Sequence, residues 1–127
     1  MVSDRQNIAA GTQQPEKFDV IIVGAGISGI GSATLLRKHC PDLSFAILEA
    51  LEGHGGTWLI HKYPGTRSDS DLFTFGYGFK PWTGQPIASR DQILDYLGDA
   101  IADAGLGPFI RYGHSVTSAN WSNETAS

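Results

Sequence analysis

The chain has 127 residues, of which 41% are hydrophobic and 17% are charged, a composition typical of a single globular domain. Its net charge of -4, without any run of lysines or arginines, argues against a nucleic acid or an anionic membrane as partner. The single cysteine excludes an internal disulfide, and no apolar run approaches the roughly 20 residues of a membrane-spanning helix. We therefore expect a cytoplasmic protein with small-molecule partners and no membrane span.

The first half of the chain has the pattern of a strand, a helix and a second strand. Residues 1–17 are polar and aperiodic, which predicts a disordered leader. The apolar run FDVIIV, residues 18–23, predicts a buried strand, and Ile27–His39 predicts a helix with basic residues in its last turn. A second apolar run, SFAILE at 44–49, completes a βαβ unit. The pattern predicts an α/β, Rossmann-like fold with a parallel sheet.

The second half begins with about forty residues rich in glycine, proline and aromatic side chains, a length that is typical of functional loops. Ser89 and Gln92 then form a Ser-x-x-Gln capping box, followed by an apolar stripe that predicts a helix ending at Gly105. Weak alternation from Ile110 to Trp121 predicts one more strand. We expect one domain over residues 18–127.

A glycine fingerprint, GAGISG, lies directly between the first strand and the first helix. Gly24 allows a sharp turn, Gly26 lets the backbone approach a pyrophosphate, and Gly29 allows close packing of helix on strand. Glu49, 20 residues after Gly29, ends the second strand, where a carboxylate can accept hydrogen bonds from ribose hydroxyls. This pattern favours FAD or NAD over NADP, although a structural glycine turn and an acid that merely ends a strand are the simpler alternatives.

A second glycine pair occurs shortly after the acid, in GGTW at residues 55–58. It resembles the pair that, in two-dinucleotide flavoproteins, lets a loop return across the pyrophosphate and approach the flavin. Together with KYPGTRSDSDLFTFGYGFKPW and SANWS, this motif resembles the class B flavoprotein monooxygenases, which include the Baeyer–Villiger and flavin-containing monooxygenases, and especially their ethionamide monooxygenase type. The resemblance implies FAD and NADPH as cofactors and O2 as co-substrate. It also implies that a C4a-peroxyflavin transfers oxygen to a ketone or to a sulfur-containing substrate.

The resemblance also implies roles for individual residues. Ser28 and Glu49 would contact the adenosine diphosphate part of FAD, and Val116 would contact the adenine through its backbone. A four-residue loop would lie against the flavin: Thr57, Trp58, Leu59 and Ile60. A polar segment would lie beside the nicotinamide cofactor: Arg67, Ser68 and Asp69, of which Asp69 also contacts the flavin side. The family usually has an acid where this chain has Leu59, so the hydrogen bond expected from that side chain is missing.

Two further motifs of the family, a second GxGxxG and FxGxxxHxxxW, do not occur in the sequence. We therefore expect residues 18–127 to be an incomplete, C-terminally truncated FAD-binding domain, with no catalytic residue of its own and no turnover alone. The four histidines lack metal-ligand spacing, so no metal is expected. A non-catalytic nucleotide-binding fragment and an NAD-dependent dehydrogenase domain are the alternative functions.

Overall fold

The βαβ unit predicted at the start of the domain is present. The structure, a computed structural model, describes residues 15–127, so the predicted leader lies almost entirely outside the described residues. Strand β1 (Val20–Val23) leads into helix α2 (Ile27–His39), which leads into strand β2 (Phe45–Leu48). The two strands pair in parallel with Val20 opposite Phe45. The predicted fold class is confirmed.

Two one-turn helices interrupt the loop region, which the sequence pattern predicts to be irregular throughout. Asp71 caps the second of them, because its carboxylate accepts a hydrogen bond from the Thr74 backbone N–H at 3.0 Å. An isolated antiparallel bridge between Arg67 and Ser89 joins this region to the start of the long helix. The remaining elements are α3 (Thr57–Ile60), α4 (Leu72–Phe75), α5 (Arg90–Ala104), a 3-10 turn η1 (Gly107–Phe109) and β3 (Ile110–Arg111).

Both ends of α5 follow from local sequence. The Ser89 hydroxyl accepts a hydrogen bond from the Gln92 N–H, and the Gln92 side chain accepts one from the Ser89 N–H, which completes the predicted capping box. Gly105 ends the helix in the left-handed conformation at φ +64°, where a residue without Cβ is unstrained. The predicted helix is therefore confirmed at both ends.

The predicted third strand is wrong beyond Arg111. Strand β3 pairs in parallel with β2 for two residues only, with Ile110 opposite Ile47. The chain then turns at Gly113, which has φ +68°, and the N–H groups of Gly113 and His114 donate to the carbonyls of Leu51 and Glu49. These bonds fold the segment over the end of β2, so it cannot continue along the strand.

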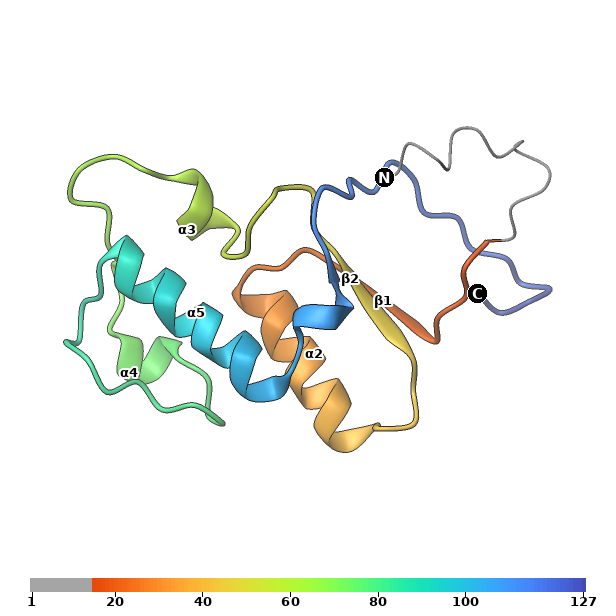
Figure 1. The fold of residues 1–127 in the computed structure, drawn as a ribbon, viewed down its shortest axis with the longest axis horizontal. Helices are drawn as coiled ribbons and strands as arrows, with labels where there is room; N and C mark the ends of the chain where they lie inside the picture. The colour runs from red at the N-terminus through yellow and green to blue at the C-terminus, as the bar shows by residue number, and fades with distance from the viewer. Residues whose placement is uncertain (1–14) are drawn as a thin grey trace.

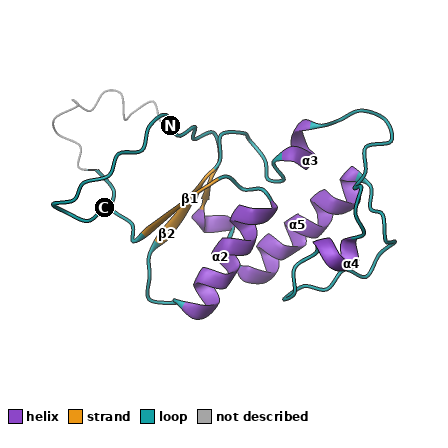
Figure 2. Cartoon of the chain, turned by 180° about the vertical axis from the view of Figure 1, so that it is seen from behind, coloured by secondary structure: helices purple, strands orange, loops and turns teal. Residues whose placement is uncertain are grey.

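The sheet has the order β1-β2-β3, and α2 and α5 lie side by side next to it (Figure 1). The core between these layers is formed by fully buried Ile30, Ile47, Ile93 and Leu97. Seen from behind, α3 and α4 lie on either side of the N-terminal half of α5, away from the sheet (Figure 2). In the described part of the chain, no helix is long and apolar enough to cross a membrane.

Candidate nucleotide-binding site

The first glycine loop has the geometry that its motif predicts. Gly24 has φ +101°, a conformation that a residue with Cβ rarely adopts. A Cβ on Gly29 would lie 1.9 Å from the Gly24 carbonyl oxygen, so the start of α2 can pack against the end of β1 only with glycine at this position. Gly26 is the N-cap of α2 and has no side chain to cap it, which leaves the first N–H groups of the helix facing outward as an anion site.

The second glycine loop packs directly against the first. The Gly55 N–H donates to the Ala25 carbonyl at 2.9 Å, and a Cβ on Gly26 would lie 3.8 Å from the Gly56 Cα. Gly55 and Gly56 have φ of +120° and +55°, which lets the loop turn back across the start of α2. The two glycine loops therefore form the facing walls of one site.

A hollow of about 440 Å³ opens between these two loops, and six of the predicted residues line it. These six are Gly24, Gly26, Ser28, Gly29, Thr57 and Trp58. Phe75, at the end of α4, forms a further wall that the sequence did not indicate, because it comes from a separate one-turn helix. The hollow thus has polar backbone at the helix start and aromatic side chains further along it.

Glu49 lies behind the first glycine loop and does not line the hollow. Its side chain is buried, and its two carboxylate oxygens accept hydrogen bonds from the N–H groups of Ala25 and Leu51, both at 2.8 Å. The pKa of the Tyr112 hydroxyl is raised, mainly by burial and to a smaller extent by the negative charge of Glu49. In this structure Glu49 therefore braces the glycine loop, and each oxygen keeps a lone pair for a further donor.

The other predicted residues are spread around the site. Leu59 and Ile60 line a separate hollow of about 480 Å³ beside Leu51. Ser68 is buried, and its hydroxyl accepts a hydrogen bond from the Ala88 N–H at 3.3 Å. Three of the predicted residues are exposed and line none of these hollows: Arg67, Asp69 and Val116.

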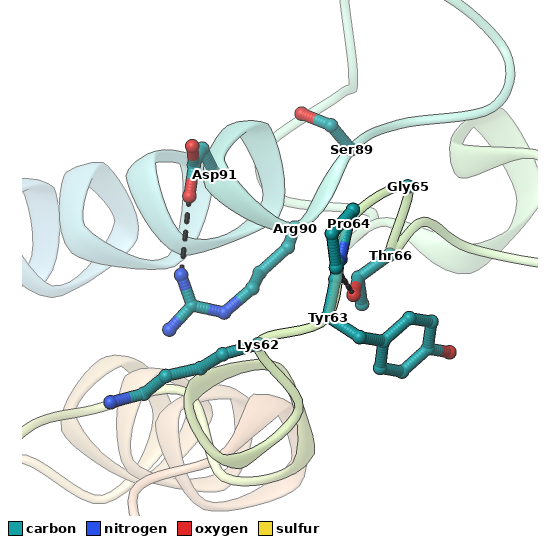
Figure 3. Close-up of a pocket in the computed structure, with 8 residues that line it drawn as sticks. All are labelled: Lys62, Tyr63, Pro64, Gly65, Thr66, Ser89, Arg90 and Asp91. Carbon is teal, nitrogen blue, oxygen red and sulfur yellow. Dashed lines mark hydrogen bonds and ion pairs between the residues drawn. The ribbon is translucent and has the colours of Figure 1, made fainter.

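A third hollow, of about 380 Å³, lies where the loop after α3 meets the start of α5 (Figure 3). Its walls are residues 62–66 and 89–91, and it includes the cationic side chains of Lys62 and Arg90. Tyr63 points away from α5 in this view. None of the predicted site residues lines it, although Arg67 and Ser68 follow directly in the chain.

Tyr77 is a residue near the site that the sequence analysis missed. Its hydroxyl donates a hydrogen bond to the Ile27 carbonyl in the first turn of α2, and its ring lies 2.8 Å from where a Cβ on Gly31 would be. Burial, and then the neighbouring Tyr96, raises the pKa of this hydroxyl above its ordinary value. The second glycine of the helix, Gly31, was the available signal, because a glycine inside a helix often marks a close neighbour.

Among the described residues, no group of three or more histidines, cysteines or acids could hold a metal ion. A nucleotide is the ligand that the two glycine loops fit.

The comparison with protein families agrees with this geometry. Residues 22–97 match the model of the NAD(P)-binding Rossmann-like domain. The chain belongs to this family. The match runs from the end of β1 through α2 and β2 to the first half of α5, and so includes both glycine loops.

Individual relatives are similar to this Rossmann-like domain along most of its length. The FAD-containing monooxygenase EthA of Mycobacterium tuberculosis is 52% identical over 108 residues, which are 84% of this chain and 22% of that protein. The probable FAD-binding monooxygenase AlmA of an Acinetobacter species is 51% identical over 107 residues. The predicted resemblance to flavoprotein monooxygenases is confirmed, and the chain spans about a fifth of the length of these relatives.

A solved structure has the same fold. The oxidized steroid monooxygenase bound to NADP superposes with a TM-score of 0.77 at 33% identity, over 84% of this chain and 21% of that one.

Proposed function

We propose that this chain is the FAD-binding portion of an NADPH- and O2-dependent monooxygenase. The observation that carries the proposal is the hollow of about 440 Å³ between the two glycine loops. A dinucleotide has a pyrophosphate at its centre, and the start of α2 offers N–H groups and the positive end of a helix dipole to such an anion. The relatives EthA and AlmA, named as FAD-containing and FAD-binding monooxygenases, support FAD as the dinucleotide.

The geometry of the second glycine loop favours FAD over a nicotinamide dinucleotide at this first site. The loop carries Thr57 and Trp58 into the hollow, which gives a planar ring system an aromatic wall beyond the pyrophosphate position. Phe75 adds a second aromatic wall. Gly26 fits the same assignment, because a side chain there would project between the two loops where the pyrophosphate would lie.

The residues of this chain would bind and orient the flavin. FAD, when bound, supplies the redox chemistry with NADPH and O2. Glu49 would accept hydrogen bonds from ribose hydroxyls with the lone pairs that Ala25 and Leu51 leave free, and Ser28 would contact the phosphates. Arg67 and Asp69, both exposed, would face the NADPH. Val116 would contact the adenine through its backbone.

The reaction catalysed by the whole protein would be a Baeyer–Villiger oxidation of a ketone or oxygenation of a sulfur-containing substrate. The motifs GGTW and RSDSD support this assignment through their resemblance to class B enzymes. We propose that the 127 residues alone do not complete this reaction, since hydride transfer requires a second dinucleotide fold to bring the nicotinamide against the flavin.

Titration of the purified chain with FAD, NAD and NADP tests the assignment. We expect saturable one-to-one binding of FAD, with a flavin absorption spectrum shifted from that of free FAD, and much weaker binding of both nicotinamide dinucleotides. One-to-one binding of NAD with no binding of FAD would favour a dehydrogenase domain instead. Stoichiometric NADP in place of FAD would contradict the role of Glu49.

A further inference from the structure

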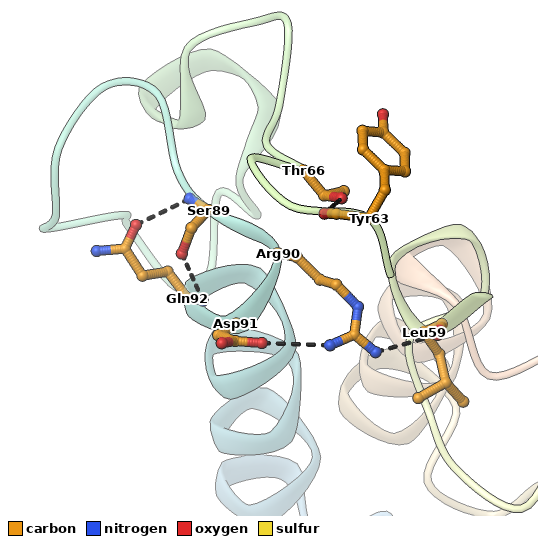
Figure 4. A network of polar contacts seen from close by, with 7 residues as sticks. All are labelled: Leu59, Tyr63, Thr66, Ser89, Arg90, Asp91 and Gln92. Carbon is orange, nitrogen blue, oxygen red and sulfur yellow. Dashed lines mark hydrogen bonds and ion pairs between the residues drawn. The ribbon is translucent and has the colours of Figure 1, made fainter. Parts of the chain in front are cut away.

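Arg90 links α3, the turn that follows the second glycine pair, to α5 (Figure 4). Its backbone is held at the first position of the helix, where its N–H donates to the Thr66 carbonyl at 3.0 Å. Its side chain runs across to α3, and Nη2 donates to the Leu59 carbonyl at 3.0 Å. The Nη1 atom pairs with Asp91 at 3.2 Å. A single guanidinium therefore bridges the first turn of α5 and the turn that carries Trp58.

Of the two side-chain contacts of Arg90, the hydrogen bond to the Leu59 carbonyl is the one that holds the side chain in place. The Arg90 side chain is only 20% exposed, whereas its ion-pair partner Asp91 is 85% exposed, so solvent screens that pair and it stabilises little. The Nε atom is buried and has no hydrogen-bond partner among the described residues. A guanidinium that is four-fifths buried needs a strong acceptor, and the partly buried Leu59 carbonyl supplies one.

Helix α3 needs such an external contact. It consists of the single turn Thr57–Ile60, and one helical turn is not stable by itself in water. Its last carbonyls have no partner inside the helix, and Arg90 supplies a donor to one of them. Leu94, one turn further along α5, supports the preceding loop, because its carbonyl contacts His54 Nε2 at 3.0 Å and its side chain fills the space beside Gly55.

We infer that Arg90 is a positioning residue, which holds α3 against α5 and so keeps Thr57 and Trp58 in the wall of the nucleotide hollow. The ligand named in this inference, FAD, rests on the proposed function. The structural part, that Arg90 holds α3 in the free chain, is independent of it. This role is not predictable from sequence, because a polar residue after a capping serine is typical of an exposed first turn.

Replacing Arg90 with methionine tests the inference, and Arg37 provides a matched control. Arg37 also donates from Nη1 to a backbone carbonyl, that of Gly105 at 3.2 Å, but it does so at the opposite end of α5. Arg90→Met should speed hydrogen exchange in the free chain at Ile60 and His61, whose N–H groups close the α3 turn. Arg37→Met should leave these two amides unchanged.

The same variants are then titrated with FAD. Loss of one charge-assisted hydrogen bond, together with a displaced α3, should raise the Kd of Arg90→Met about tenfold, with Arg37→Met close to wild type. Arg90→Lys should recover part of the affinity, because an ammonium keeps the charge and one of the two contacts. If Arg90→Met does not fold, the exchange comparison is made on Arg90→Lys, which should show partial loss of protection at the same two amides.

The outcomes separate the two claims. A wild-type chain that binds no FAD would refute the proposed function, while the exchange comparison would still decide whether Arg90 holds α3. Exchange at Ile60 and His61 that is equal in the wild type and the measured Arg90 variant would overturn the inference. So would faster exchange spread evenly over the whole chain, because this would indicate general destabilisation.

Discussion

Alanine substitutions at Gly26 and Gly29 should separate the folding role of the glycine fingerprint from its binding role. A Cβ at Gly29 would lie 1.9 Å from the Gly24 carbonyl oxygen and 3.0 Å from its carbonyl carbon. To bring the oxygen contact out to an ordinary distance, the start of α2 would have to move from β1 by about 1–1.5 Å against close packing. The group in the way is backbone, so no side-chain rotation can relieve the clash.

The expected cost follows from two opposing terms. Overpacking a well-packed interior costs about 1–3 kcal/mol, and the upper end applies here because backbone must move. Alanine in a helix interior recovers about 1 kcal/mol relative to glycine. We therefore expect Gly29→Ala to lower the free energy of unfolding by about 2 kcal/mol, measured by urea denaturation of the free chain.

Gly26→Ala should have the opposite profile. Gly26 has φ -85°, which alanine adopts without strain, and the nearest atom to its Cβ would be the Gly56 Cα at 3.8 Å. Stability should therefore change by less than about 1 kcal/mol. The new methyl group would project between the two glycine loops, and FAD affinity should fall tenfold or more, which is about 1.4 kcal/mol. Equal stability losses in the two variants, or full FAD affinity in Gly26→Ala, would refute this division of roles.

Three further changes test other parts of the account. Glu49→Gln should destabilise the free chain by about 1.5–3 kcal/mol, because an amide NH2 would face one of the two N–H groups that the carboxylate accepts. Arg67→Gln, at an exposed site, should change stability by less than about 0.5 kcal/mol in the same urea assay, so equal losses would count against Glu49 as a brace. The folded-state pKa of Tyr77 is raised above the unfolded value of about 10, so its contribution to stability is present below that pH and is lost as the pH rises above it. Tyr77→Phe should therefore reduce the loss in free energy of unfolding between about pH 9 and pH 11. Tyr63→Phe, which changes an exposed ring, should not reduce it. Identical pH profiles for the two variants would contradict the assignment. Finally, the FAD-saturated chain should oxidise NADPH no faster than free FAD does, and substrate-dependent oxygenation above that background would show that the chain is competent alone.

The elements that were predictable from the sequence are those specified by short-range chemistry. The capping box of Ser89, the C-terminal Gly105 and the apolar runs around the glycine fingerprint each depend on residues within a few positions of one another. The two glycine loops were predictable for the same reason, because each one can be recognised from the glycines of its own short motif. Gly24 and Gly26 were predicted from this pattern, Thr57 and Trp58 were predicted from the family resemblance, and all four line the hollow.

The features that were missed depend on contacts between distant segments. Strand β3 stops at Arg111 because His114 bonds to Glu49 across more than sixty positions of the chain, which alternation of side chains cannot reveal. Phe75, Tyr77 and Arg90 reach the site from separate segments, and their sequence neighbourhoods look like ordinary loop or exposed helix. The bracing role of Glu49 was also hidden, because the spacing that predicts a ribose contact also suits a hydrogen bond to Ala25.

The most direct test of the central claim is a hydrogen-exchange footprint of FAD on the wild-type chain. We expect slower exchange on FAD addition at two segments, residues 24–29 and residues 55–58, which lie on the two sides of the hollow. The hollow formed by residues 62–66 and 89–91 should keep its exchange rates, and so should the far end of α5. Protection confined to 62–66 and 89–91, or no change at either glycine loop at saturating FAD, would contradict the placement of the nucleotide between the two loops.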